Sequence, residues 1–169
     1  MDLPSCKLIY SSAFYSCTNL TSINLPSCTS ISGYAFYNCL KLTDINLPVC
    51  TYIGSYAFGN CSSLSSIDLP ACTIVSSGGF AGCKGLASIS LPICTVIYDN
   101  AFTNCTNLSS LEAPSCTYIG SYIFNNCYSI SQISLPLLNS LPSYVFYSCS
   151  ALKSVYLGCT TINGISSSS

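Results

Sequence analysis

Hydrophobic and polar positions along this chain follow an order that recurs every 22 residues. Residues 42–63, LTDINLPVCTYIGSYAFGNCSS, show the order well, and the other segments are variants of it. A strict period between 20 and 50 residues is typical of a solenoid, in which successive coils stack on one another. One phenylalanine falls at the same place in each repeat, at Phe14, Phe36, Phe58, Phe80, Phe102, Phe124 and Phe146. We expect these rings to form a continuous buried spine, each packed offset against the next.

Each repeat is expected to contain several short elements. Residues 20–25 end in apolar and polar alternation, which predicts a half-buried strand, and Pro26 ends it because proline cannot donate to a ladder. Residues 28–31 predict a second extended piece, followed by a turn where Gly or Ser recurs. Residues 35–39 carry Ala, Phe and Cys at i, i+1 and i+4, which predicts one turn of α- or 3₁₀-helix.

The repeats predict a single solenoid over residues 1–163 and a polar tail at 164–169, which we expect to fray. The divisions are a partial coil at 1–19, full coils at 20–41, 42–63, 64–85, 86–107, 108–129 and 130–151, and a partial coil at 152–163. One coil cannot bury its own apolar face, so the stack itself must supply the core.

The string L-x-x-I-x-L-P-x-C-T-x-I-x-x-x-A-F-x-x-C resembles the BspA-like leucine-rich repeats of bacterial and protozoal surface proteins. The shared parts are the L-x-x-I-x-L strand, the I-G-x-x-A-F segment and the F-x-x-C ending, and they cover residues 3–163. The resemblance implies an α/β repeat solenoid, a right-handed stack of leucine-rich-repeat-like coils. It would have a parallel sheet on one face and short helical or 3₁₀ turns opposite. The extra Cys in L-P-x-C and the scarcity of charge depart from the family pattern.

Only 5% of the residues are charged, whereas soluble domains average about 25%. The repeat explains this, because equivalent positions of neighbouring coils lie about 4.8 Å apart and a repeated charge would face its own copy. The charged positions obey the rule: Asp68 has Asn46 and Ser90 as repeat neighbours, and Glu112 has Ser90 and Ser134. Neutral polar residues are therefore expected to fill the outward columns.

Composition argues against several functions. A net charge of −1 with four scattered Lys does not predict nucleic-acid binding, which needs a clustered basic surface. No apolar run approaches the length of a membrane span, so we expect no membrane insertion. The chain opens within a repeat and without the segments of a signal peptide, so we expect it to be a piece of a longer protein.

Catalysis and cofactor binding are not predicted. The chain has no His, so a Ser or Cys nucleophile would lack its usual base. The acidic residues are spread over many coils, and only Asp44 and Asp68 could be neighbours, diagonally across adjacent strands. Because Ca²⁺ requires six or more oxygen ligands, this pair favours no metal site. We expect a protein that is not an enzyme and that holds no cofactor or metal.

The fourteen cysteines fall into two columns. A metal site is disfavoured because there is no C-x-x-C pair and no His. Stacked Cys are close enough for disulfides, but parallel Cβ vectors are poor geometry for the bond. One column accepts Leu138 in place of Cys, which favours reduced thiols packed as small apolar groups. The columns are Cys6, Cys28, Cys50, Cys72, Cys94, Cys116 and the shifted Cys159; and Cys17, Cys39, Cys61, Cys83, Cys105, Cys127 and Cys149.

The outward strand positions are the leading candidate for a ligand-binding surface, because solenoids use extended sheets for recognition. We expect a protein partner, including host proteins, to bind Asp44, Asn46, Asp68, Ser90 and Glu112. The resemblance implies an adhesin at the cell surface or secreted.

Other interpretations remain open. The neutral, Ser-rich surface is also consistent with a purely structural spacer in a larger surface protein. The end coils carry no capping repeat, so end-to-end self-association is a further interpretation. Tyr34, Tyr56, Tyr122 and Tyr144 form either an aromatic strip for carbohydrate or protein, or a cover for the apolar edge. Ice binding through the Thr column is disfavoured, since no second flat column lies beside it.

Overall fold

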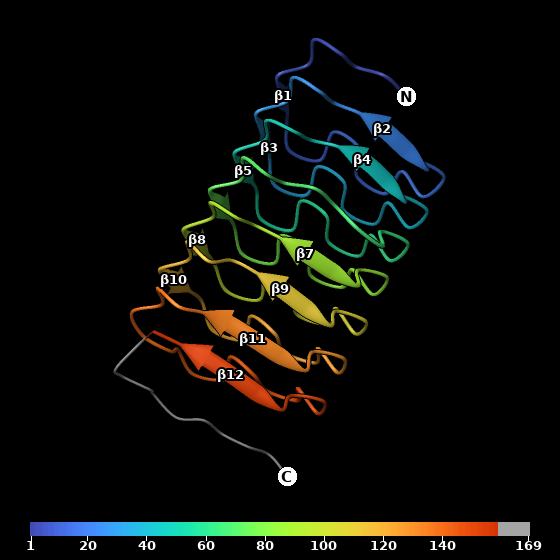
Figure 1. Ribbon diagram of the computed structural model, residues 1–169. Coiled ribbons are helices and arrows are strands. Elements are labelled where there is room, and N and C mark those ends of the chain that lie inside the picture. The colour runs from blue at the N-terminus through green and yellow to red at the C-terminus, as the bar shows by residue number, and fades with distance from the viewer. Residues whose placement is uncertain (159–169) are drawn as a thin grey trace.

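The computed structural model describes residues 1–158, which form an elongated stack of coils (Figure 1). Residues 159–169 lie outside the described part, and with them the predicted end of the last coil, Cys159 and the polar tail. Successive coils are paired at a register of one repeat, as in Ser22 with Asp44 and Ile23 with Ile45. The predicted solenoid of stacked, parallel-paired coils is therefore confirmed.

The first strand of each repeat lies on one broad side of the stack, facing the reader in Figure 1. These strands are β2 (Ser22–Asn24), β4 (Asp44–Asn46), β7 (Ser88–Ser90), β9 (Ser110–Glu112), β11 (Gln132–Leu135) and β12 (Ser154–Leu157). They do not form one sheet: β2 pairs only with β4, whereas β7, β9, β11 and β12 form a separate four-stranded sheet. We call the outward residues of these strands, together with Ser66 and Asp68 between β4 and β7, the strand face.

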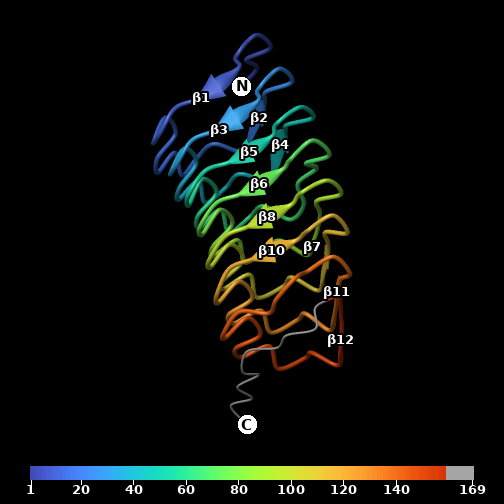
Figure 2. The ribbon, with the colours of Figure 1, turned by 90° about the vertical axis from the view of Figure 1, so that its left-hand side faces the viewer.

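The second extended piece of each repeat forms a sheet of its own, a six-stranded parallel one (Figure 2). Its strands are β1 (Leu8–Ile9), β3 (Ser30–Ile31), β5 (Tyr52–Ile53), β6 (Ile74–Val75), β8 (Val96–Ile97) and β10 (Tyr118–Ile119). Each is only two residues long, with its second residue buried. This sheet continues without a break past the point where the sheet on the strand face is divided.

The predicted helical turn is wrong, because residues 1–158 contain no helix and the Phe segment is a series of tight turns. Its amides alternate between two kinds of acceptor: Cys39 N–H donates within its own turn to the Phe36 carbonyl (3.1 Å), but Phe36 N–H donates to Ala57 of the next coil (2.7 Å). Backbone N–H groups that donate to the next coil are not available for the hydrogen bonds of a helix. In addition, Tyr34 and Asn38 have φ of 58° and 60°, a left-handed conformation that a right-handed helix cannot include.

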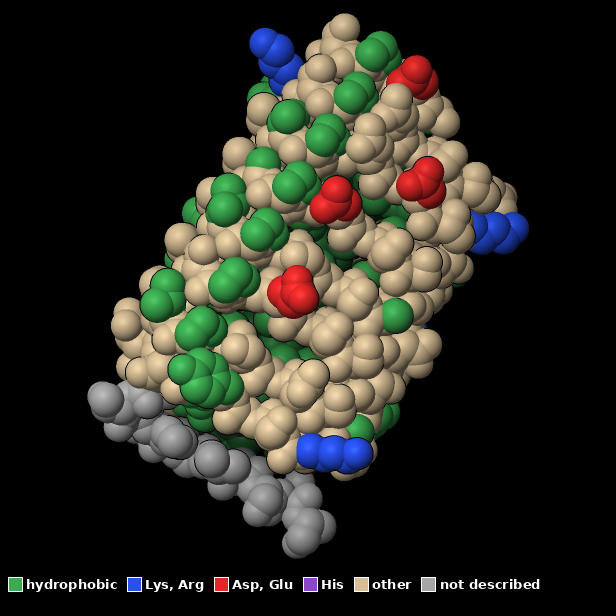
Figure 3. All heavy atoms as spheres, in the orientation of Figure 1, with side chains coloured by type: hydrophobic (Ala, Val, Ile, Leu, Met, Phe, Trp, Pro, Cys, Tyr) green, Lys and Arg blue, Asp and Glu red, His purple; other side chains and the backbone are tan. Residues whose placement is uncertain are grey.

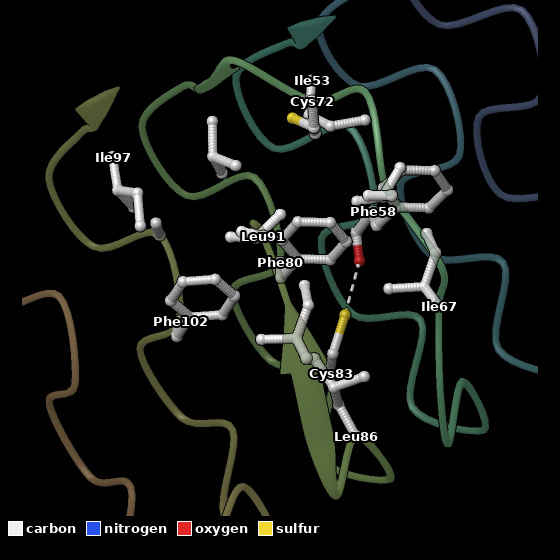
Figure 4. Packing of buried hydrophobic residues seen from close by; sticks show 14 of the residues in the cluster. Ile53, Phe58, Ile67, Cys72, Phe80, Cys83, Leu86, Leu91, Ile97 and Phe102 are labelled. Carbon is white, nitrogen blue, oxygen red and sulfur yellow. Dashed lines mark hydrogen bonds between the residues drawn. The ribbon is translucent and has the colours of Figure 1, made fainter. Parts of the chain in front are cut away.

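The predicted phenylalanine spine is confirmed. Phe80 is fully buried, and its ring centroid lies 5.4 Å from that of Phe58 and 5.6 Å from that of Phe102 (Figure 4). The planes of these neighbouring rings differ by 5° or less, so the rings are parallel and laterally offset. Aliphatic side chains from both sets of strands, such as Ile53 of β5 and Ile89 of β7, complete the core around the spine.

The cysteines are free thiols that serve as buried donors. In the column beginning at Cys39, each thiol donates to the carbonyl of the preceding coil's Phe, as from Cys83 Sγ to Phe58 O (3.0 Å, Figure 4). In the other column each thiol donates two residues ahead, as from Cys50 Sγ to Tyr52 O (3.4 Å). Of the thirteen described cysteines, only Cys6 and Cys17 are partly exposed.

Burial makes most of these thiols weak acids; the exception is Cys94, whose pKa is lowered by a side-chain hydrogen bond with Cys72. Desolvation raises the pKa of Cys39 and Cys50 from 9.0 to about 11, and that of Cys105 to about 12. The thiolate of an adjacent coil would add repulsion, as Cys17 does for Cys39. Since the thiolate is the nucleophile, the buried thiols should be inert at neutral pH.

Replacing Phe80 by Ala should lower the free energy of unfolding by about 3–5 kcal/mol, because it opens a cavity in the middle of the spine. Tyr118→Ala is the control, since the Tyr118 side chain is 47% exposed and should change stability far less. Denaturant melts compare the two variants with the parent chain. Equal losses in both would show that the spine does not hold the coils together.

A thiol reagent applied to the folded protein should modify Cys6 and Cys17 first and leave the eleven buried thiols unmodified. In denaturant without reductant, all of them should react, because none is held in a disulfide. Peptide mapping by mass spectrometry assigns each modified residue. Loss of reactivity at Cys39 and its column neighbours in unreduced, denatured protein would instead indicate disulfides and an oxidising compartment.

Stability should fall as the pH rises from about 9 towards 11. The folded-state pKa of buried thiols such as Cys105 is raised, so their contribution is fully present below the unfolded pKa of 9.0 and is lost as the pH passes through the folded value. Thermal melts at pH 8, 9, 10 and 11 measure the effect. Cys105→Ala should weaken the pH dependence relative to the parent chain, and an unaltered dependence would exclude this thiol as a contributor.

Candidate protein-binding surface

The strand face is a polar surface held on paired backbone. Within each three-residue strand the middle residue is buried and its neighbours point outward, as in β7, where Ile89 lies between exposed Ser88 and Ser90. Alternation of this kind is a property of the extended chain, so the outward side chains of one strand have fixed positions relative to one another. The five predicted site residues are all exposed on this face, namely Asp44, Asn46, Asp68, Ser90 and Glu112.

The structure brings three of the predicted residues into direct succession. Asp68 pairs with Ser90, and Ser90 pairs with Glu112, whose Oε2 accepts a hydrogen bond from Ser90 Oγ at 3.3 Å. Asp44 stands in the neighbouring outward row, opposite Ser22. Asn46 shares the row of Asp68, but no strand pairing joins the two residues. The predicted set is thus two groups on one face, with a division between Asn46 and Asp68.

Sequence reasoning missed an amide ladder on this face. Asn46 Nδ2 donates to Asn24 Oδ1 at 2.8 Å, and Asn24 Nδ2 donates to Asp2 Oδ1 at 2.8 Å. The signal was present in the sequence, because the three side chains are spaced by one repeat. A ladder of this kind orients its amides, so only their outer edges remain for a partner.

The strand face carries most of the acidic charge of the chain. Four of the five acidic residues, Asp2, Asp44, Asp68 and Glu112, lie on this side. Figure 3 shows acidic side chains spread over the face and Lys side chains at its margins. Among residues 1–158, no three His, Cys, Asp or Glu side chains are placed to hold a metal ion. The acidic side chains are thus dispersed along the strand face.

The tyrosines at the repeat position of Tyr34, for which the sequence left open an aromatic strip or a cover for the apolar edge, lie in two separate clusters. Tyr34 and Tyr56 stack at 5.4 Å, and Tyr37 meets Tyr34 edge-on at 5.4 Å. Tyr122 and Tyr144 stack at 4.9 Å in the second cluster. The rings present their faces to one another, which leaves mainly edges and hydroxyls exposed. The sequence pattern missed the contributions of Tyr15, Tyr37 and Tyr147.

The threonine column uses its hydroxyls internally. Thr51 Oγ1 donates to the Thr29 carbonyl at 3.1 Å, and Thr73 Oγ1 donates to the Thr51 carbonyl at 3.0 Å. Hydroxyls already committed to neighbouring coils are poor ligands for an external lattice. The column serves instead as a side-chain reinforcement of the six-stranded sheet.

Comparison with solved structures finds other leucine-rich repeat proteins, and comparison with curated proteins finds no match. The crystal structure of a leucine-rich repeat protein from T. pallidum is similar, with 25% identity and a TM-score of 0.68, over 96% of this chain and 72% of that one. A leucine-rich repeat protein from Bacteroides ovatus is 21% identical, with a TM-score of 0.43, over 96% of this chain and 70% of that one. A leucine-rich cell surface protein from Faecalibacterium prausnitzii is 19% identical, with a TM-score of 0.45, over 87% and 62% respectively. Separately, residues 1–158 include no helix long and apolar enough to cross a membrane.

The family model for the BspA-type leucine-rich repeat region matches residues 2–93 and 73–169, and it comprises six copies of the repeat. Together the two matched ranges cover residues 2–169, which include every coil described above. This chain belongs to the BspA-type leucine-rich repeat family.

Proposed function

We propose that this chain is a non-enzymatic protein-binding module of a cell-surface or secreted adhesin, and that it binds its partner through the strand face. Membership of a leucine-rich repeat family supports a role in protein interaction. The observation that carries the proposal is the presence of Asp44, Asp68 and Glu112 on one exposed face of a chain otherwise almost free of charge.

The charge of the face favours a partner with a basic surface. Complementary charges steer encounter and discriminate between partners more than they add affinity. The face is poor in the Tyr, Trp and Arg side chains that dominate binding hot spots, apart from Tyr156. Affinity should therefore be modest and should decrease with added salt.

Replacing Asp44, Asp68 and Glu112 together by Ser should weaken binding to a partner captured from host protein extracts by about tenfold, since about 1.4 kcal/mol of charge attraction is lost. Ser is suited to these sites because Ser66, Ser90 and Ser134 hold the same positions in other coils. Titration calorimetry on the purified pair measures the affinity. The control adds the same three units of charge off the face, as Thr18→Lys, Asn107→Lys and Ser150→Lys at exposed turn positions.

An unchanged affinity in the folded Ser variant, together with a loss in Tyr34→Ala, would move the site to the tyrosine clusters. The second candidate function, a structural spacer, is favoured by the neutral Ser-rich remainder of the surface. Under that alternative no partner binds this chain, and flanking domains keep their activity when it is replaced by an unrelated rigid solenoid of equal length.

A further inference from the structure

The coil at residues 64–85 differs from its neighbours on the strand side. Figure 1 shows no strand between β4 and β7, where residues 66–68 cross the strand face. Within the described residues, Asp68 makes a single bridge to Ser90 and no strand pairing joins it to β4. The sheet on this side is consequently divided into a two-stranded and a four-stranded part.

Asp68 gives a chemical reason for the division. The amide ladder runs with each Nδ2 donating toward the N-terminal neighbour, from Asn46 to Asn24 and on to Asp2. The next member of the row must therefore offer a donor to Asn46 Oδ1. An ionised Asp68 has only acceptors, so the ladder ends there and two acceptor groups are left side by side.

Two further outer ladders stop in the same coil because glycine replaces their side chains. Asn60 Nδ2 donates to Asn38 Oδ1 at 3.0 Å, but the next position is Gly82. Tyr34 stacks on Tyr56, but the next position is Gly78. Both glycines keep the left-handed backbone of their columns, with φ of 67° and 74° at Gly78 and Gly82 respectively. Four of the ten glycines of the chain lie within residues 78–85.

The opposite side of the same coil is continuous. Phe80 stacks on both neighbouring rings, and β6 (Ile74–Val75) pairs with β5 and β8 in the six-stranded sheet. Backbone bonds also continue through the Phe segment, as from Phe80 N to Ala101 O at 2.9 Å. One side of this coil is therefore fully connected and the other is not.

We propose that residues 64–85 are a built-in hinge that divides the solenoid into two arms, residues 1–63 and 86–158. The phenylalanine spine and the six-stranded sheet act as the pivot, and the strand face opens and closes between β4 and Asp68. Bending leaves the spine stacked and the six-stranded sheet paired, because the strand pairing and the side-chain ladders that are missing all lie on the outer side of this coil. Motion at such a hinge changes the separation of Asp44 from Glu112 and so adapts the strand face to curved surfaces. The hinge does not depend on the proposed function.

Distance distributions between nitroxide labels, measured by pulsed electron resonance, test the proposal. Labels are introduced as non-natural amino acids, because the chain has many Cys. The first pair is Ser22 with Ser88, which are three repeats apart across the hinge, and the matched pair is Ser88 with Ser154, three repeats apart within one arm. All three positions are exposed. We expect the distribution across the hinge to be about twofold wider, since arms joined on one side only open at low cost.

A repair variant supplies the second measurement. Asp68→Asn, Gly78→Tyr and Gly82→Asn restore the three outer ladders with residues that the chain already uses in those columns. A Cβ added at Gly78 would clash with the Tyr56 ring, and one added at Gly82 with the Asn60 amide, so both side chains must shift. Tyr34 and Asn38 show the positions available to them, since Tyr34 stacks on Tyr56 and Asn38 accepts a hydrogen bond from Asn60. The variant should narrow the distribution across the hinge and leave that of the matched pair unchanged.

Equal widths for the two label pairs in the parent chain would overturn the hinge. Any fraying of the last coil would widen the distance distribution of the matched pair. It would therefore reduce the expected difference between the two pairs and could not produce it. Should the triple variant fail to fold, Asp68→Asn alone, an exposed and isosteric change, should still narrow the distribution across the hinge. No narrowing in a folded repair variant would overturn the assignment of the hinge to these residues.

Discussion

Hydrogen bonding between coils at a register of one repeat is the constraint on which the rest of this structure depends. Backbone donors such as Phe36 N–H find their acceptors one repeat away rather than in their own turn. Every side chain in the interior of the stack therefore lies beside its own counterparts. Residue types that tolerate a copy of themselves are favoured in every column, which accounts for stacked Phe, stacked Thr and the scarcity of charge.

The same constraint decides which features could be predicted from the sequence. The phenylalanine spine, the inward Ile and Leu of the strands and the dilution of charge all follow from the period alone, and the structure has them. The helical turn was predicted wrongly, because the i, i+1, i+4 spacing at residues 35–39 fits a pair of tight turns as well as it fits a helix. The left-handed backbone at Tyr34 was unexpected, since Tyr rarely adopts that conformation. Asn adopts it more often, so the Asn at position 38 could have indicated a turn there.

For the candidate surface, the sequence predicted that Asp44, Asp68 and Glu112 would lie on one exposed face, since alternation assigns side chains to faces. It did not predict the division between Asn46 and Asp68. That division depends on the direction in which amide donors run along a row, and only an arrangement in three dimensions fixes this direction. The tyrosines at the repeat position of Tyr34 lie in two clusters because Gly78 and Asn100 occupy that position in the coils between them.

The neutrality of the outward columns has a consequence for how such proteins change in length. A coil whose exterior is Ser, Thr and Asn can be duplicated or deleted anywhere in the array, because each new neighbour is again a compatible neutral group. A coil that carries Asp44 or Asp68 cannot be copied in tandem without placing one carboxylate about 4.8 Å from another. Coils that carry a charge should therefore stay single in the array, and neutral coils are the units whose duplication or loss changes its length.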